Sequence, residues 1–430
     1  MRTFIIIWAG QLTSTVGSYM TEFALILWAW NLTGSATALA LVGFFSQLPR
    51  IPITLVAGLI VDRYNRKHLM MLGDAIAALS TVSIGLLYFT NSLQIWHLYL
   101  VAAMSGGFGQ IQRLAYSTSI AMIVPKHHYT RANSMDSAVH YGSAIIAPAL
   151  AGTLYPQIGL PGILAIDLVT FGVAIATLLA VQIPQPQPQA EGAVETIGYK
   201  LTFGFRHVWR QPGLRALLMI TALFWFAHDL GEAIYDPMIL ARTEGNATIL
   251  GSTASAAGIG GVTGAVVLSA WGGPKRRVHG MLLGFIGAGI SKTIFGLGRS
   301  PLIWIPAQFC SSLNFPLLGS SETAIWMEKI APEIQGRVFA ANMLVVQIVS
   351  AIALLIAGPL ADRVFEPAMQ LNRHFAAIFS PLVGTGAGAG MALLYILTSV
   401  GLVLVGLGGY VSPPLQTVDQ ALAESEKLES

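Results

Sequence analysis

The sequence predicts an all-α membrane protein with twelve transmembrane helices in two six-helix pseudo-repeats around a central cavity. Of its 430 residues, 54% are hydrophobic and 10% are charged, whereas soluble proteins have about 25% charged residues. Twelve apolar windows also have the roughly 20-residue length that crosses a bilayer. A net charge of +3 is too small to indicate a nucleic-acid partner. The lone Cys310 cannot form an intrachain disulfide, and we expect neither a metal nor a cofactor.

The twelve windows are bounded by charged residues, proline or glycine. In the first half they cover residues 3–30, 38–60, 69–89, 95–122, 134–155 and 162–181. In the second half they cover residues 214–240, 249–271, 281–297, 302–327, 338–360 and 391–411. The first window contains Glu22 and has no convincing cleavage site, so it predicts a retained helix and not a signal peptide.

Lysine and arginine are distributed unequally between the two sides of the predicted membrane segments. Sixteen of the 23 fall on one side and four on the other, while Arg50, Arg113 and Lys292 lie within predicted helices. Since cytoplasmic loops are enriched in these residues, we expect both termini in the cytoplasm and a multi-pass protein of the cell inner membrane.

A proline-rich connection divides the chain. Residues 183–190 read IPQPQPQA, which favours an extended spacer. We therefore predict an N-terminal six-helix bundle (1–183), a cytoplasmic linker (184–213), a C-terminal six-helix bundle (214–411) and a cytoplasmic tail (412–430). Residues 199–209 mix aromatic and basic residues, which is typical of a short helix on the inner leaflet; a solvated linker is the alternative. Residues 362–390 are expected to form an outer loop.

An internal repeat supports two equivalent halves. Residues 33–39 (TGSATAL) match residues 244–250 (EGNATIL) at an offset of 211, and the same offset places Arg66 on Arg277 and Pro148 on Pro359. Parallel repeats of this kind are a transporter architecture in which two bundles rock about a site between them.

Residues 58–67 (GLIVDRYNRK), between the second and third predicted helices, resemble the signature loop G-x-x-x-D-[RK]-x-G-[RK]-[RK] of the major facilitator superfamily. The matching residues are Gly58, Asp62, Arg63, Arg66 and Lys67. Asn65 replaces the second glycine, and we expect it to permit a left-handed turn. We expect Gly58 to allow a close helix approach and Asp62 to form a cytoplasmic latch with Arg63, Arg66 or a helix N-terminus. The alternative is that the basic residues only set topology.

Further segments resemble the macrolide-efflux and enterobactin-exporter type of this superfamily, in its drug:proton antiporter branch. They include WAGQLTSTVGSYMTEFAL, AIDLVTFGVAI and QGRVFAANM. The resemblance implies export of amphipathic compounds in exchange for protons. The antiporter signature of the fifth helix survives only as Gly142, Pro148 and Gly152, and the arginine-led signature of the fourth helix is absent.

Three predicted helices carry polar stripes at helical spacing. In the superfamily, helices 1, 4, 7 and 10 line the central cavity. Because ionisable residues at membrane depth are costly, we select Glu22, Arg113, Asp229 and Glu232 as transport and proton-coupling candidates. The cavity-lining candidates are Gln11, Thr15, Ser18, Gln110, Trp225 and Asp236. For Glu22 and Arg113 the alternative is a fixed structural ion pair or an unrelated contact, and for Asp236 it is an interface position.

Other polar residues have structural interpretations. We expect a structural partner for Arg50, snorkelling of Lys292 to the membrane surface, and packing or capping roles for Asp74 and Asp167. The roles of Asp136, His140 and Glu322 stay open. Residues 258–264 (GIGGVTG) predict close helix packing, and residues 289–293 (GISKT) lack the glycine that a nucleotide-binding P-loop needs.

The sequence therefore predicts a secondary active transporter, with no enzyme activity, that exports amphipathic small molecules by alternating access in exchange for protons. The alternatives are a proton-linked importer or facilitator of a polar metabolite, and a non-transporting receptor or scaffold on the same fold. The expected partners are a small-molecule substrate, protons and membrane lipid, and the expected state is a monomer.

Overall fold

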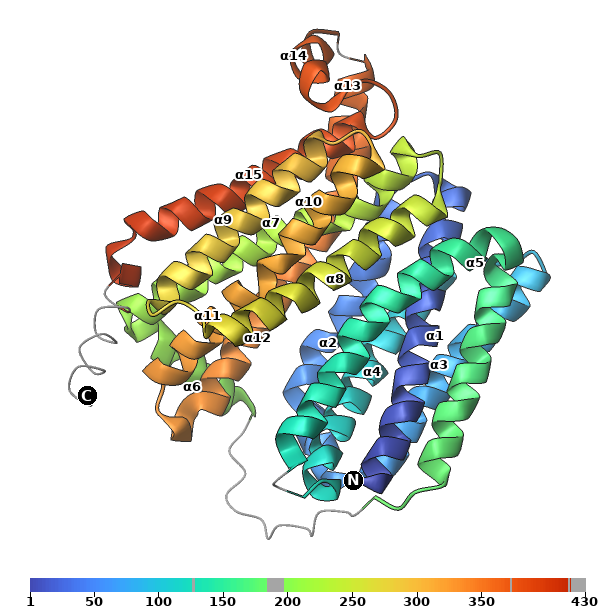
Figure 1. Ribbon diagram of the computed structural model, residues 1–430, viewed down its shortest axis with the longest axis vertical. Coiled ribbons are helices and arrows are strands. Elements are labelled where there is room, and N and C mark those ends of the chain that lie inside the picture. Colours follow the sequence, from blue (N-terminus) through green and yellow to red (C-terminus); the bar gives the residue numbers. More distant parts are fainter. Residues whose placement is uncertain (126–127, 184–196, 372, 417, 419–430) are drawn as a thin grey trace. The chain divides into compact units, whose positions relative to one another are not determined.

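The computed structural model describes residues 1–125, 128–183, 197–371, 373–416 and 418, which form helices and short connections without a strand (Figure 1). Residues 184–196 of the predicted linker, and residues 417 and 419–430 of the predicted tail, lie outside the described residues. The helices from the first half of the chain are α1 (Arg2–Thr33), α2 (Ala36–Arg63), α3 (Arg66–Phe89), α4 (Ile95–Ile123) and α5 (Tyr129–Leu179). The helices that follow are α6 (Ile197–Arg210), α7 (Pro212–Arg242), α8 (Ala247–Trp271), α9 (Arg277–Leu297), α10 (Pro301–Leu313), α11 (Phe315–Lys329), α12 (Pro332–Leu360), η2 (Ala361–Phe365), α13 (Glu366–Leu371), α14 (Arg373–Val383) and α15 (Ala389–Val411).

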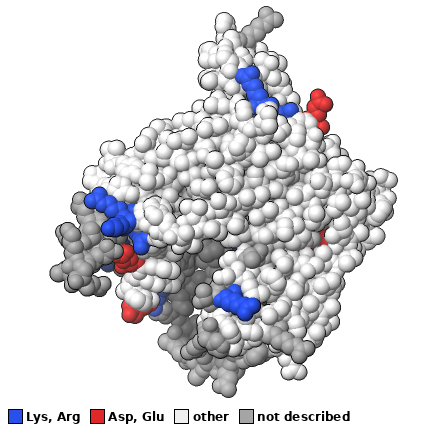
Figure 2. Space-filling view, in the orientation of Figure 1, with Lys and Arg blue, Asp and Glu red and all other residues white. Residues whose placement is uncertain are grey.

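All twelve predicted membrane segments fall on helices of the described chain. The fifth and sixth segments form the single run α5, which breaks at Gly159 with φ 62° and ψ −171°. The tenth segment is divided at Asn314 into α10 and α11. Within the described residues, eight helices are long and apolar enough by themselves to cross a membrane. On the face drawn in Figure 2, the helix flanks are almost free of charged residues, as a hydrocarbon surrounding requires.

The chain divides into two compact units. The first comprises Met1–Val194 with Thr243–Ser255, and the second comprises Glu195–Arg242 with Ala256–Ser430. The helix α8 therefore contributes its beginning to the first unit and its remainder to the second. The predicted domain limits, which assign the whole of α8 to the C-terminal bundle, stay a prediction.

Element boundaries follow the repeat that the sequence predicts. The starts of α2 and α8, at Ala36 and Ala247, are 211 residues apart, and so are the starts of α3 and α9 at Arg66 and Arg277. The preceding turns correspond as well, because Gly34 and Gly245 both have a left-handed backbone, with φ 57° and 79°. Glycine adopts this conformation without the steric cost of a Cβ atom.

Glycines bring helices together inside each unit. A Cβ atom at Gly106 of α4 would overlap the carbonyl oxygen of Ser46 on α2. In the second unit, Cβ atoms at Gly260 and Gly264 of α8 would overlap the carbonyl oxygens of Phe309 and Leu313. Close helix packing through residues 258–264 is thereby confirmed.

The expected outer loop at 362–390 is wrong for most of its length, because η2, α13 and α14 occupy it. The Glu366 carboxylate accepts hydrogen bonds from the backbone N–H groups of Gly388 (2.6 Å) and Met391 (3.1 Å), at the start of α15. The Arg242 guanidinium donates to the backbone carbonyls of Gly298 and Val383. The Glu366 and Arg242 side chains thus satisfy backbone N–H and carbonyl groups at helix ends. They connect α13 and α14 to α15 and α7.

Candidate functional site

The second unit contains an ion pair between α7 and α9 that is buried on the lysine side only. Glu232 lies on α7, and its Oε2 atom is 2.7 Å from the Nζ atom of Lys292 on α9. The Lys292 side chain is 3% exposed and the Glu232 side chain is 44% exposed. The carboxylate thus presents one side to accessible space while its other side neutralises a buried ammonium group.

The expectation that Lys292 snorkels to the membrane surface is wrong. Its ammonium group points inward to Glu232 and lies 5.5 Å from the centre of the Tyr395 ring. A buried ammonium group needs a counter-charge, and an aromatic ring adds favourable electrostatics. Glu232 is 60 residues away in sequence, so the spacing along α9 alone could not identify it.

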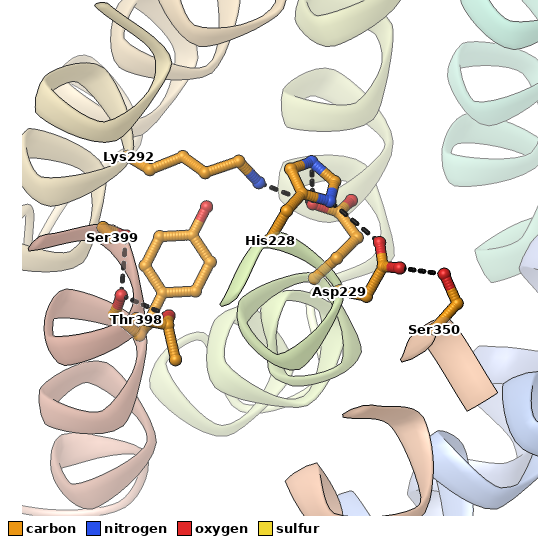
Figure 3. Close-up of polar contacts among 8 residues, drawn as sticks. His228, Asp229, Lys292, Ser350, Thr398 and Ser399 are labelled. Atoms are coloured by element: carbon orange, nitrogen blue, oxygen red, sulfur yellow. Dashed lines mark hydrogen bonds and ion pairs between the residues drawn. The ribbon is translucent and has the colours of Figure 1, made fainter. Parts of the chain in front are cut away.

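Asp229 joins α7 to α12 on the same face of α7 (Figure 3). The Ser350 hydroxyl of α12 donates to one oxygen of the Asp229 carboxylate. The Nδ1 atom of His228 lies 3.0 Å from the other oxygen, and its Nε2 atom lies 4.0 Å from the Glu232 carboxylate. The polar contacts therefore run from Lys292 through Glu232, His228 and Asp229 to Ser350. We call these five residues the α7 polar cluster.

Sequence reasoning selected Asp229 and Glu232 but missed the other cluster members. His228 had a usable signal, since it stands four residues before Glu232, which is a contact spacing on a helix. Ser350 lies 121 residues from Asp229 and resembles any other serine in an apolar helix. Only the packing of α12 on α7 selects it.

Aromatic rings border the α7 polar cluster. The His228 ring lies 5.0 Å from the Phe315 ring of α11 and 5.3 Å from the Trp225 ring, measured between ring centres. Trp225 is half-buried on the predicted cavity stripe. Flat apolar surfaces beside an accessible carboxylate suit a ligand with a ring system and a basic group.

The first unit holds the other coupling candidates. Glu22 on α1 is exposed, and the positive charge that acts on it is that of Arg50 on α2. Arg113 on α4 is also exposed, and it donates to the side-chain oxygen of Gln110, whose amide donates to Thr54 over 3.3 Å. Glu22 and Arg113, both described residues, form no ion pair. The alternative of a fixed ion pair between Glu22 and Arg113 is therefore not seen among the described residues.

Part of the polar stripe on α1 is used for packing. The Gln11 amide lies 3.5 Å from the Asp74 carboxylate, which also accepts a 2.6 Å hydrogen bond from Gln112. The Thr15 hydroxyl donates to the backbone carbonyl of Gln11. Ser18 lies beside Asp167, which accepts from Thr81 over 2.9 Å.

Asp74 and Asp167 are 2% and 1% exposed. Their positions agree with the packing roles expected for them. Asp236, the last residue of the α7 stripe, is half-buried near the end of α7.

The signature loop has buried and exposed members. Arg66 is 7% exposed and donates to the Thr118 carbonyl of α4 over 3.1 Å, and Lys67 donates to the Val181 carbonyl after α5 over 2.7 Å. Arg63 is exposed, and the Asp62 side chain is 76% exposed and lies 3.8 Å from Arg66. Arg66 and Lys67 therefore connect helices within the first unit.

Two expectations about this loop need adjustment. Asn65 has φ −62° and ψ 117°, so the left-handed turn is wrong; its side chain caps α3 by accepting from the His68 N–H over 3.3 Å. Asparagine is a favoured N-cap residue, and an N-cap residue has an extended backbone like that of Asn65. A Cβ atom at Gly58 would meet no heavy atom within 4 Å, so Gly58 makes no close helix approach within the first unit.

The remnant of the helix 5 signature lies partly at a crossing with the beginning of α8. A Cβ atom at Gly152 would lie 2.8 Å from the Ala247 carbonyl oxygen, and one at Gly251 would overlap the Pro148 carbonyl oxygen. Thr248 donates to the Gly152 carbonyl over 3.1 Å. A Cβ atom at Gly142, in contrast, would meet no heavy atom within 4 Å.

Known proteins match most of this chain. Residues 7–354 match the family described as Major Facilitator Superfamily. The chain is 26% identical over 363 residues to Macrolide efflux protein A of Streptococcus pyogenes, covering 84% of this chain and 90% of the relative. It is 25% identical over 396 residues to Multidrug efflux pump Tap of Mycolicibacterium fortuitum, covering 90% of this chain and 94% of the relative.

Solved transporter structures share the fold. A bacterial homolog of the human lysosomal transporter Spinster superposes with a TM-score of 0.64 at 15% identity, covering 98% of this chain and 96% of that chain. A POT family transporter in complex with a thioalcohol-conjugated peptide gives 0.69 at 12% identity, covering 95% and 96%. The predicted all-α fold of twelve transmembrane helices is confirmed. Because the family match covers most of the sequence and these folds agree, the chain belongs to the Major Facilitator Superfamily of membrane transporters.

Proposed function

We propose that this transporter exports amphipathic small molecules from the cytoplasm in exchange for protons, by alternating access across the cell inner membrane. The observation that carries the proposal is the half-exposed Glu232 carboxylate, which lies between a buried ammonium group and the aromatic rings beside His228. The efflux proteins named among its relatives support the direction of transport. Both termini would lie in the cytoplasm, and the functional unit would be a monomer.

Competition for a carboxylate is the simplest way to couple the two fluxes. An accessible carboxylate can bind either a proton or the positive group of a substrate, and each ligand then weakens the binding of the other. Glu22 is exposed, and Arg50 acts on it without forming an ion pair within 4.0 Å. We therefore retain Glu22 as the first coupling residue.

Asp229 and Glu232 form the second coupling site in this proposal. Glu232 already neutralises Lys292, so a proton or a substrate reaching it must compete with an internal cation. Asp229 is bound by Ser350 and adjoins His228. Proton occupancy here would change a contact between α7 and α12.

The remaining polar residues receive supporting roles. Gln110, Arg113, Trp225 and Asp236 stay cavity-lining or substrate-contacting candidates. Gln11, Thr15 and Ser18 would shape the α1 stripe through their contacts within the first unit. The exposed members of the signature loop, Asp62 and Arg63, would act at the cytoplasmic gate.

Substrate flux in proteoliposomes with an imposed pH gradient tests the proposal. The wild-type protein should concentrate an amphipathic substrate against its gradient only when protons can flow the opposite way. Glu22→Gln should retain substrate binding while losing both the pH dependence and the uphill transport. Glu328→Gln, which neutralises an exposed acid of α11, is the matched control and should behave as the wild type.

Two results would contradict the coupling scheme. Uphill transport by Glu22→Gln with an unchanged pH profile would move the proton site to Asp229 and Glu232. Unchanged coupled flux after neutralising those two residues as well would replace exchange by facilitated diffusion. A wild-type protein that moves no substrate under either gradient would favour a receptor or scaffold.

A further inference from the structure

The short helix α6 is held where two membrane-spanning helices begin (Figure 1). It ends at Arg210, and α7 begins at Pro212. Its inner face packs on the start of α12: a Cβ atom at Gly204 would overlap the Arg337 carbonyl oxygen, and Val208 is 1% exposed. Since the hydropathy of α7 and α12 predicts that both cross the membrane, we expect α6 at the boundary between hydrocarbon and water.

The opposite face of α6 combines aromatic and basic side chains. Phe205 is 45% exposed and Trp209 is 49% exposed, and their rings stack with centres 5.5 Å apart. Arg206 and Arg210 are exposed next to them. The spacing of four residues within each pair places an aromatic row beside a basic row along the helix.

A third arginine extends this surface onto α7. Arg215 is exposed, and its guanidinium carbon lies 5.7 Å from the centre of the Trp209 ring. Among the described residues, no carboxylate forms an ion pair with Arg206, Arg210 or Arg215. The positive charge of the surface is therefore not neutralised by the described part of the chain.

We propose that Phe205, Arg206, Trp209, Arg210 and Arg215 form a binding surface for the headgroups of anionic phospholipids. Tryptophan and phenylalanine rings partition to the level of the headgroups. Arginine guanidinium groups bind phosphate through paired N–H donors, which suits a lipid phosphodiester. Phe205 and Trp209 are about half exposed beside the starts of α7 and α12. Exposing these apolar rings to water would be unfavourable, so a lipid surface is the better neighbour for them.

Quenching of tryptophan fluorescence by brominated lipids tests this surface in the full-length protein. The chain has nine tryptophans, so the Trp209 signal is taken as the difference between the wild type and Trp209→Phe. In phosphatidylcholine vesicles, brominated phosphatidylglycerol should quench this signal at lower mole fractions than brominated phosphatidylcholine does. Replacing Arg206, Arg210 and Arg215 by glutamine should remove the preference, since each arginine contributes about fivefold to affinity for an anionic surface.

Two controls distinguish lipid binding at this surface from a general effect of positive charge and from binding of free phosphate. Lys275→Gln removes an exposed positive charge elsewhere in the second unit and should retain the preference. Inorganic phosphate at equal concentration should not relieve the quenching, because it lacks the acyl chains that meet the aromatic row.

The comparison of the two brominated lipids needs only the wild type and Trp209→Phe, so it decides the proposal even if the triple arginine variant fails to fold. Equal quenching by phosphatidylglycerol and phosphatidylcholine would overturn it. So would a triple arginine variant that folds and retains the full preference, or displacement of the lipid by free phosphate. In those cases α6 is a packing element for α12 or binds another anion.

Discussion

The ion pair between Lys292 and Glu232 predicts that its two partners are not equally important for stability. Their atoms are 2.7 Å apart, but the Lys292 side chain is 3% exposed and the Glu232 side chain is 44% exposed. Neutralising Glu232 leaves a buried ammonium group without its counter-charge. Removing the lysine leaves a carboxylate that is 44% exposed and is therefore less costly to leave unpaired. Glu232→Gln, at the more exposed partner, should therefore lower the free energy of unfolding more than a substitution of Lys292 does.

The expected magnitudes follow from the burial of the group left behind. Breaking a buried ion pair by removing one partner costs about 3–5 kcal/mol, and we expect about 3 kcal/mol for Glu232→Gln, because the amide oxygen still accepts one hydrogen bond. Lys292→Met fills similar volume and leaves a half-exposed carboxylate, so about 1 kcal/mol is expected. The double variant should also lose about 1 kcal/mol, which gives a coupling energy of about 3 kcal/mol between the two positions.

A double-mutant cycle on the purified protein measures these values. The free energy of unfolding is obtained from titration with sodium dodecyl sulfate in mixed micelles, followed by circular dichroism. Glu328→Gln, at an exposed position on α11, serves as the control and should change the free energy by less than about 0.5 kcal/mol. Equal losses for Glu232→Gln and Lys292→Met, or simple additivity in the double variant, would refute the reasoning from burial.

Three further predictions concern gating, packing and topology. Asp62→Asn should leave the free energy of unfolding within about 0.5 kcal/mol of wild type, because the side chain is 76% exposed, yet slow substrate flux; unchanged flux in proteoliposomes would reduce the signature loop to a topology signal. Gly106→Ala should lower the free energy of unfolding by about 1–3 kcal/mol, since the new Cβ atom overlaps the backbone of α2, whereas Gly109→Ala meets no atom within 4 Å; equal effects in the same unfolding titration would contradict this packing. Accessibility labelling should find tags at Gln187 and at the C-terminus in the cytoplasm and a tag at Asn372 outside, and an external tag at Gln187 would disprove the predicted topology.

The helical framework could be predicted because it depends on local properties of the chain. An apolar run of membrane length must satisfy its backbone polar groups internally, so it becomes a helix whatever surrounds it. The same reasoning explains why the repeat was visible: the 211-residue offset relates the starts of α2 and α8 and of α3 and α9. Prediction from local properties fails at 362–390, because Glu366 and Arg242 hold the short helices there through contacts with residues distant in sequence.

The sequence by itself determined the membrane class, the segments that form helices and the acids of α7 that stand on one face, because hydropathy and helical spacing are properties of neighbouring residues. Tertiary structure alone decided the partners of those acids. Lys292 and Ser350 reach Glu232 and Asp229 from α9 and α12, and Arg113 bonds to Gln110 of its own helix and not to Glu22. A charge in an apolar helix requires a partner, but which helix supplies it depends on how the helices pack around one another.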